Sequence, residues 1–507
     1  MALESLNSFD HARLSFNAAT SREERSQIGQ FLTPVSIADF MASLFKSAKK
    51  DVRILDPGAG AGVLFYALIS KLVAQIKRPS SIEVVAYETD RTILPLLRDA
   101  IVRCSVLCEQ NKVPFTGTIK EEDFIAAAIS ATEDSLFATP AKPFTHAILN
   151  PPYKKINGDT HTRAMLYSAG LEVANLYAAF VWLSIRMLEP GGQIVAITPR
   201  SFCNGPYFKK FREDFLRMLS LRRIHVFGAR NKAFGDDNVL QENIIYHAVR
   251  EDKKPQKVLI SVSDNDDFAR SKQMRIAYDQ IVQPGDRDAF IYLGFEEKAS
   301  SALKQIQFFK TSLDELNLNV STGRTVDFRA KEYLFPSIRE GCVPLIYPCH
   351  FQDGFIHWPS KSGKKPNAIM SHPETADLLL KQGYYVLVKR FSTKEQKRRV
   401  MAAVYDPSKI DTPFVSFENH VNYYHRQGQG FPEKLAKGLA LYLNSSVVDE
   451  YFRLFSGHTQ VNATDLRKLP YPTQEQLLSL GNYLTDQMPL QQAIDNILQE
   501  ECLKGGQ

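Results

Sequence analysis

Several features that mark other protein classes are absent or scarce in these 507 residues. The six cysteines form no C-x-x-C pair, so the sequence predicts neither a zinc site nor a disulfide framework. No apolar run reaches the roughly 18 residues that a membrane span needs, and the first residues lack the apolar core of a signal peptide. The composition, 44% hydrophobic and 23% charged, is that of a globular protein. We therefore expect a cytoplasmic protein of two or three domains, with no metal and no membrane association.

The net charge is a modest +6, which by itself does not indicate a nucleic-acid partner. The segment 331–400 nevertheless carries twelve Lys and Arg against six Asp and Glu. Such a cluster suits phosphate groups, whereas a solvated surface gives the same pattern without any ligand. Both interpretations stay open. The candidates for phosphate contacts are Lys364, Lys365, Lys389, Arg390, Lys394, Lys397, Arg398 and Arg399.

The tetrapeptide 150–153, Asn-Pro-Pro-Tyr, directly follows the apolar segment 145–149. Two successive prolines fix φ and offer no N–H, so a strand ends there and the loop becomes rigid. Asn150 puts an amide at the strand end, and Tyr153 adds a flat ring that loses little entropy on stacking. The pair could hold a planar amine, although a rigid Asx-Pro turn is the plain alternative.

A glycine-rich turn lies between the β-type segment 52–56 and the apolar helical segment 63–75. Gly58 and Gly60 let the backbone approach a ligand, and the following helix N-terminus offers free N–H groups. The turn has neither the Gly-Lys-Ser/Thr of a P-loop nor the G-x-G-x-x-G of a dinucleotide site. Asp56 ends the first strand, and its carboxylate suits a ligand that carries a positive charge.

Further strand ends bring polar side chains to the same edge. Glu88 follows the strand 82–87, where a carboxylate can accept hydrogen bonds from two ribose hydroxyls. Asp123 and Phe124 follow a third strand and could contact an exocyclic amine and a purine, with a plain loop as the alternative. The continued alternation of strands and helices predicts an α/β fold with a doubly wound, mostly parallel sheet, whose ligand sites lie at the carboxyl ends of the strands.

Thr33 and Pro34 precede the apolar-periodic segment 37–45. Threonine as N-cap and proline at the first helical position form a common helix start. That role explains both residues without a ligand.

A charged, proline-terminated stretch at 251–255 predicts a domain boundary. We expect a catalytic domain over 1–253 and a mixed α+β domain over 254–507. The second domain shows short β-like runs among loops, with helices at 433–443 and 446–455.

The order of these motifs resembles that of the γ-class N6-adenine DNA methyltransferases of type II restriction-modification systems, more narrowly the PstI- and BsuBI-like modification methylases. GQFLTP resembles the family's N-terminal cofactor motif, DPGAGAG its glycine loop, YETD its ribose carboxylate, EDF its adenine contact and NPPY its catalytic motif. STGRTVDF and the segment 443–472 resemble the specificity-domain sequences. Asp56 stands where many members have Glu, which shortens that acidic arm.

The resemblance implies a Rossmann-like class I methyltransferase domain followed by a DNA-specificity domain. It implies that Asn150, Pro151 and Tyr153 hold the target adenine and that Phe234 is a second aromatic contact to it. S-adenosyl-L-methionine would be bound by Gln30, Phe31, Thr33, Pro34, Asp56, Gly58, Gly60, Glu88, Asp123, Phe124 and Asn150.

The reaction that the resemblance implies is methyl transfer to the N6 amine of a flipped-out adenine in double-stranded DNA. It would protect a recognition site, CTGCAG by the same resemblance, from a separate cognate restriction endonuclease. We expect a monomer on DNA. No residue of the sequence itself identifies the site.

Three alternatives compete with this interpretation. Enzymes that methylate a glutamine side-chain amide also use NPPY, but they do not need some 250 further residues. A restriction enzyme fused to a methylase would need a nuclease cluster, and Glu296-Glu297-Lys298 lacks a convincing upstream Pro-Asp. A DNA-binding protein without turnover is disfavoured by the intact motifs.

Overall fold

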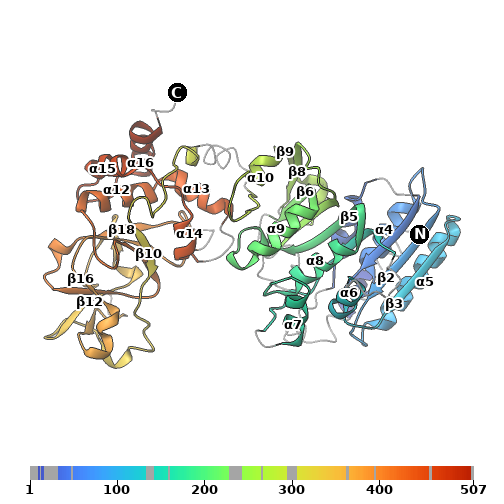
Figure 1. Ribbon diagram of the computed structural model, residues 1–507, viewed down its shortest axis with the longest axis horizontal. Coiled ribbons are helices and arrows are strands. Elements are labelled where there is room, and N and C mark those ends of the chain that lie inside the picture. Colours follow the sequence, from blue (N-terminus) through green and yellow to red (C-terminus); the bar gives the residue numbers. More distant parts are fainter. Residues whose placement is uncertain are drawn as a thin grey trace. The chain divides into compact units, whose positions relative to one another are not determined.

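The structure is a computed structural model, and it describes most of the chain. The described residues form two compact units, which divide the chain into 1–292 and 293–507 (Figure 1). The described residues are 9–11, 13–15, 32–46, 50–132, 142–157, 160–227, 243–263, 266–293, 305–360, 365–392, 396–455 and 460–503.

The described residues of the first unit form a nine-stranded sheet with the order β3-β2-β1-β4-β5-β7-β6-β8-β9. Strands β1 to β5 pair in parallel, and β7 inserts antiparallel between β5 and β6. The strands are β1 (Asp51–Asp56), β2 (Ser81–Tyr87), β3 (Phe115–Lys120), β4 (Phe144–Leu149), β5 (Leu188–Pro199), β6 (Leu219–Phe227), β7 (Asn243–Arg250), β8 (Lys257–Ser263) and β9 (Lys272–Ala277). The expected doubly wound, mostly parallel sheet is confirmed.

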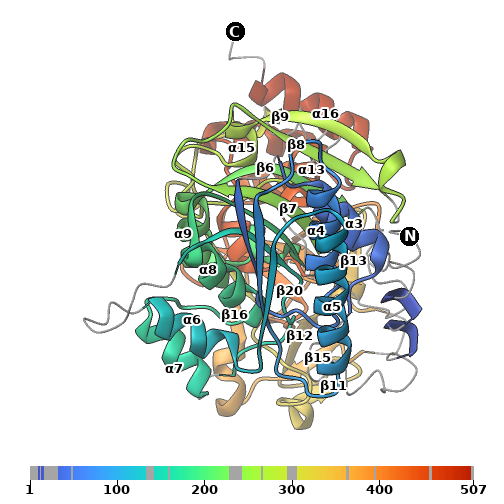
Figure 2. The same ribbon diagram turned by 90° about the vertical axis from the view of Figure 1, so that its right-hand side faces the viewer.

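Helices cover both faces of this sheet. Figure 2 shows α3, α4 and α5 on one side of the strands and α8 and α9 on the other. The first group encloses an apolar core in which α4 is buried along almost its whole length. The helices are α3 (Val35–Ser43), α4 (Val63–Val73), α5 (Leu94–Gln110), α6 (Phe124–Thr132), α7 (His161–Ser168), α8 (Leu176–Met187), α9 (Lys209–Met218) and α10 (Tyr278–Ile281).

The second unit contains two smaller mixed sheets and a group of helices. The six-stranded sheet has β10 (Asn319–Thr322), β20 (Val421–His425), β17 (Tyr385–Lys389), β18 (Ala402–Tyr405), β14 (Phe355–Ile356) and β13 (Phe351–Gln352), in that order. The five-stranded sheet has β11 (Leu334–Phe335), β15 (Ala368–Met370), β12 (Cys342–Ile346), β19 (Phe414–Phe417) and β16 (Leu379–Lys381). The helices are α12 (Glu433–Leu443), α13 (Ser446–Phe455), α14 (Ala463–Arg467), α15 (Gln474–Leu480) and α16 (Gln491–Leu498).

The boundary between the two units lies later in the sequence, at 292/293, than the boundary expected at 253/254. Strands β8 and β9 lie beyond that point but pair with the first unit's sheet, β8 against β6 and β9 against β8. The charged stretch 251–255 is therefore the connection between two strands of one sheet, and the first unit continues to Tyr292. No helix in the part of the chain that the structure describes is long and apolar enough to cross a membrane.

Candidate functional site

A cavity of about 300 Å³ opens at the carboxyl ends of β1, β2 and β4. It brings together most of the residues that the sequence motifs singled out, although these come from four separate parts of the first unit. The predicted residues that line it are Gly58, Gly60, Glu88, Asp123, Phe124, Asn150, Pro151 and Tyr153.

Glu88 ties the glycine loop to the end of β2. The N–H of Gly60 donates to Glu88 Oε2 at 2.9 Å, and the N–H groups of Thr89 and Asp90 donate to Oε1, each at 2.8 Å. Burial raises the pKa of Glu88, while these backbone hydrogen bonds act to lower it. Gly60 has φ +51°, a left-handed conformation that favours glycine. Because each carboxylate oxygen can accept more than one hydrogen bond, Glu88 keeps acceptor capacity for a ligand.

Asp56 lies at the end of β1 and has no exposed surface. Neither of its carboxylate oxygens finds a partner at hydrogen-bonding geometry among the described residues. Burial raises its pKa well above the usual range; the nearby Gly58 N–H lowers the pKa and the Glu88 charge raises it. Asp56 does not itself line the cavity, whereas its neighbours Pro57 and Gly58 do. A buried carboxylate is costly, so this position suits a ligand that donates hydrogen bonds or carries positive charge.

Asn150 reaches back to the segment before α3. Its Nδ2 donates to Thr33 Oγ1 at 3.1 Å, and this bond fixes the plane of the amide and thereby the position of its oxygen. The expected helix start needs correction, because the N-cap is Pro34 and no side chain caps the helix. The Thr33 hydroxyl accepts a hydrogen bond from Asn150 instead of binding the helix backbone.

Tyr153 is held between strand β5 and a second tyrosine. Its hydroxyl donates to the Ile197 carbonyl at 3.3 Å. Its ring packs edge-to-face with that of Tyr177, with the centroids 6.3 Å apart at 81°. Tyr177 is buried, and its hydroxyl shares a 2.9 Å hydrogen bond with Ser201 Oγ. Burial raises the pKa of both phenols, so each remains a neutral hydrogen-bonding group.

Tyr177 is a residue that the sequence analysis missed. It meets Tyr153 because the chain leaves at Lys154, forms α7 and returns at Leu176, whose N–H donates to the Lys154 carbonyl at 2.9 Å. A second bond, from the Ile156 N–H to the Ala174 carbonyl at 2.8 Å, closes the base of this excursion. The only sequence signal was the position of an aromatic residue at the start of an apolar helix.

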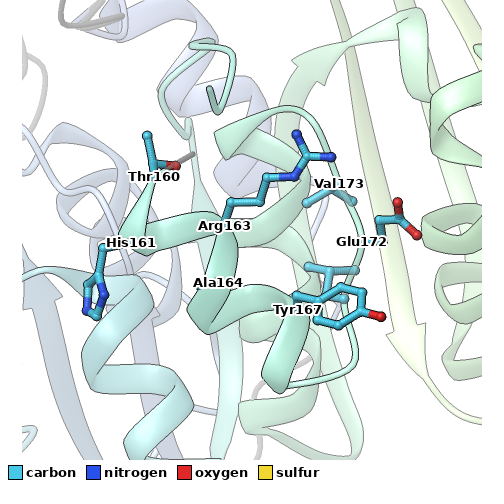
Figure 3. A pocket seen from close by; sticks show the side chains of 8 residues that line it. Thr160, His161, Arg163, Ala164, Tyr167, Glu172 and Val173 are labelled. Carbon is cyan, nitrogen blue, oxygen red and sulfur yellow. The ribbon is translucent and has the colours of Figure 1, made fainter. Parts of the chain in front are cut away.

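The excursion carries a second, open pocket of about 570 Å³ on its outer side. Figure 3 shows Arg163, Tyr167 and Glu172 around it, and His161 at the start of α7 lines it as well. Thr162, on the same helix, lines the first cavity. Helix α7 therefore forms a wall between the two.

Asp123 and Phe124 lie where β3 leads into α6. The Ala126 N–H donates to Asp123 Oδ1 at 2.9 Å, as at a capped helix N-terminus. Phe124 is buried, with its ring centroid 5.2 Å from that of Tyr87 and 5.1 Å from that of Phe180. Tyr87 and Phe180 line the cavity too, and sequence reasoning passed over both.

Five predicted site residues lie outside the described residues, so their roles stay predictions. They are Gln30, Phe31, Phe234, Lys364 and Lys394.

The remaining basic candidates of the second unit differ in exposure. Lys397 and Lys365 are both exposed, and Lys365 pairs with Asp327 at 2.8 Å. Lys389 is half-buried, with its ammonium 5.3 Å from the centre of the Phe351 ring.

Arg399 does not fit the expected role of a phosphate contact, whereas that role stays a prediction for the half-buried Arg398. Arg399 is fully buried, and its Nε donates to Ser392 Oγ at 3.1 Å. Arg398 donates to the Ser445 carbonyl at 3.0 Å and to Gln491. The Arg399 guanidinium therefore stabilises the interior of the second unit, and a run of charges in the sequence did not reveal that this residue turns inward.

Known proteins are similar in sequence to nearly the whole chain. The segment 99–234 matches the family model described as Eco57I restriction-modification methylase. The chain is 42% identical over 503 residues to the type II methyltransferase M.BsuBI of Bacillus subtilis, with 98% of each chain covered. It is 40% identical over 491 residues to the type II methyltransferase M.PstI of Providencia stuartii, covering 97% of this chain and 96% of that protein.

Among solved structures, the type IIL restriction-modification enzyme MmeI in complex with DNA is similar in fold. The TM-score is 0.53 at 11% identity, over 90% of this chain and 70% of that chain. The chain is 42% and 40% identical to M.BsuBI and M.PstI over almost their full length. It therefore belongs to the family of type II methyltransferases.

Proposed function

We propose that the protein transfers a methyl group from S-adenosyl-L-methionine to the N6 amine of an adenine in double-stranded DNA. The observation that carries this proposal is that Asn150 and Tyr153 line the same cavity as Gly60 and Glu88. A group that can hold a planar amine thus lies beside a loop and a carboxylate that can hold a nucleoside.

The cavity fits S-adenosyl-L-methionine, which would supply an electrophilic methyl group. Glu88 would accept hydrogen bonds from the ribose hydroxyls, and Asp123 and Phe124 would contact the adenine ring of the cofactor. Asp56, buried and without a partner at hydrogen-bonding geometry among the described residues, would meet the positively charged part of the ligand. Gly58 and Gly60 leave room for the backbone to approach it.

The target adenine would stack on Tyr153. A base inside a duplex is out of reach, so it must be flipped out at a cost of a few kcal/mol. Stacking on an aromatic ring returns about 1–3 kcal/mol per base, which offsets much of that cost. The bond to Ile197 and the edge contact with Tyr177 hold the ring in one orientation before the base arrives.

Asn150 and Pro151 would activate the amine. The nitrogen lone pair of adenine N6 is delocalised into the ring, which makes it a poor nucleophile. The Asn150 side-chain oxygen and the Pro151 carbonyl would accept the two N6–H bonds and draw the nitrogen toward tetrahedral geometry. The hydrogen bond to Thr33 supports this role because it orients the Asn150 amide in advance. No covalent intermediate with the protein is required.

The proposal includes the partners that the names of the related type II methyltransferases suggest. The second unit would bind duplex DNA and choose the site, and a separate endonuclease of the same specificity would be the functional counterpart. The site would be CTGCAG, and one protomer would methylate one strand at a time.

One experiment separates this function from its rivals. The protein is incubated with tritiated S-adenosyl-L-methionine and plasmid DNA, and the nucleosides are identified after digestion. N6-methyladenine in the DNA is the expected product. Label in protein would point to an amide methyltransferase, cleaved plasmid to a fused endonuclease, and neither label nor cleavage to a protein without turnover.

A further inference from the structure

Four segments of the second unit meet at one end of its six-stranded sheet. The Gly323 N–H donates to the Val421 carbonyl at 2.8 Å, and the Arg390 N–H donates to the His420 carbonyl at 2.9 Å. The Val461 N–H in turn donates to the Arg390 carbonyl at 2.7 Å. The segments 321–325, 417–422, 389–391 and 460–461 thus lie side by side, and we name them together the convergent edge.

Both sequence motifs of the second unit contribute to the convergent edge, and their inward residues hold it together. Thr322 Oγ1 donates to Asn422 Oδ1 at 3.0 Å, and Asn422 Nδ2 donates to the Val461 carbonyl at 2.7 Å. A Cβ at Gly323 would lie 2.1 Å from the Glu418 carbonyl oxygen, so only glycine allows this close approach. The inward residues are therefore explained by the hydrogen bonds and close packing that join the segments. The same contacts do not account for the side chains on the outer surface.

The outward side chains are cationic, amide and aromatic. Phe391 is 44% exposed, and its ring centroid lies 5.0 Å from that of the exposed His420. The Arg390 guanidinium lies 5.9 Å from the centre of the Phe391 ring. The side-chain amides of Asn419 and Gln460 form no hydrogen bond with the residues that the structure describes. In what we call the outward set, Arg324, Phe391 and His420 are exposed, and Arg390, Asn419 and Gln460 are half-buried.

The one carboxylate within these segments is hidden. Glu418 is 1% exposed and binds His420 Nδ1. Its charge therefore faces the His420 ring and the interior, whereas the Arg324 side chain is exposed and that of Arg390 is half-buried. This distribution complements a polyanion.

Arg390 is held in place rather than free to follow a phosphate. Its Nη1 donates to the Asn419 carbonyl at 3.1 Å, and its Nε is buried without a hydrogen-bond partner in the described structure. A guanidinium fixed in this way presents its remaining N–H groups in one direction. Fixed guanidinium and amide groups are the side chains that pair with base edges in the major groove.

We propose that the convergent edge is the surface with which the second unit reads base pairs of duplex DNA. The inference rests on the proposed function, which supplies DNA as the substrate, but it adds where and through which side chains sequence is read. Asn419 and Gln460 would bind base edges, Arg390 would donate to an acceptor on a base, and Phe391 would contact an apolar base surface.

The test compares sequence discrimination between variants. The preferred site of the wild-type protein is selected by binding from a pool of random-sequence duplexes. Binding is then measured for that duplex and for duplexes in which each base pair is changed in turn. Each wrong base pair read by a good contact lowers affinity by about 10- to 100-fold. We expect Arg390→Ala, Asn419→Ala or Gln460→Ala to abolish that difference at one position of the site while preserving it at the others.

The matched control is Gln352→Ala, which removes an exposed amide on β13 at the opposite edge of the same sheet. It should retain wild-type discrimination, and thermal unfolding should show that all variants fold. Unchanged discrimination in all three variants would overturn the proposal. So would an equal loss of affinity for every duplex, since that result means contacts to the phosphate backbone alone.

The selection experiment needs no methyl transfer. The proposed function and the proposal of base reading can therefore each be refuted without the other. A wild-type protein that selects one sequence but never methylates it would refute the proposed function and leave base reading intact. A protein that methylates adenine but selects no sequence in binding would refute base reading at the convergent edge.

Discussion

The two units build their candidate surfaces differently. In the first unit the residues of the candidate site lie at the ends of adjacent strands, each within a short motif. In the second unit the convergent edge joins segments that are far apart in the sequence, such as 321–325 and 460–461. A parallel sheet brings every strand's carboxyl end to one side, so local sequence reveals the site. The second unit has no such rule, because its mixed sheets pair in both directions. Sequence motifs there mark the segments that touch but not the surface that they build.

The comparison also concerns charge. The first unit buries Asp56, whose carboxylate oxygens find no partner at hydrogen-bonding geometry among the described residues, whereas the second unit buries Glu418 and leaves Arg324 exposed. If the first unit holds a cationic nucleoside and the second an anionic duplex, variants in the two units should separate chemistry from DNA binding.

The largest effect is expected for Asn150→Ala. Methyl transfer should fall by about 10²–10³-fold or be lost, since a group aimed at the reacting amine contributes on this order. Binding of S-adenosyl-L-methionine, measured by calorimetry, should persist. Asn157→Ala, an exposed asparagine in the same loop, is the control and should retain activity. Retained turnover in the Asn150 variant would sink its assigned role.

Tyr153→Ala should come next. Loss of stacking worth about 1–3 kcal/mol predicts a turnover roughly 10- to 100-fold lower. A mismatch opposite the target adenine makes flipping easier, so it should restore part of the rate. Tyr177→Phe keeps the ring edge and loses the hydroxyl with its bond to Ser201, and it should cost much less. If the mismatch gives no rescue, Tyr153 does not act on the flipped base.

Asp56→Asn should change stability and cofactor binding in opposite directions. Burial raises the folded-state pKa of Asp56 above the reference value of 3.8, so its favourable contribution is complete below that value and is lost as pH rises through the folded pKa. The neutral variant should therefore be more stable than the wild type near pH 7, and this gain should vanish in acid.

Affinity for S-adenosyl-L-methionine should fall by about tenfold in the same Asp56→Asn variant, because a charge-assisted contact is lost. Denaturant unfolding across pH, together with calorimetry, measures both effects. A variant that is less stable at pH 7 would show that the Asp56 carboxylate is satisfied in a way that the structure does not reveal.

The smallest effect is expected for Lys397→Ala in the second unit. Removal of one phosphate contact should reduce the slope of log affinity against log salt by about one and leave cofactor binding unchanged. Lys434→Ala, another exposed lysine of the second unit, should leave the slope as it is. Equal slopes for both variants would favour a solvated role for Lys397.

The strands, the glycine loop and the NPPY site could be predicted because each rests on consecutive residues. The domain boundary could not be predicted, because a charged stretch such as 251–255 has the same sequence pattern in a linker between domains as in a loop between two strands of one sheet. Arg399 was misjudged for a related reason: a basic run does not show which of its members turns inward beside Ser392. Tyr177 was invisible because its partner lies across the excursion that contains α7.

The hydroxyl of Tyr153 has a consequence for how firmly the NPPY loop is held. Strand β4 pairs with β5 as far as Leu149 opposite Ala196, and the two prolines that follow offer no N–H to continue. The next carbonyl of β5, that of Ile197, is taken by the tyrosine side chain instead. A side chain thus extends the sheet past the point where the backbone stops. The Tyr153 ring, on which the proposed function would stack a base, consequently belongs to the framework of the fold and need not be assembled at each turnover.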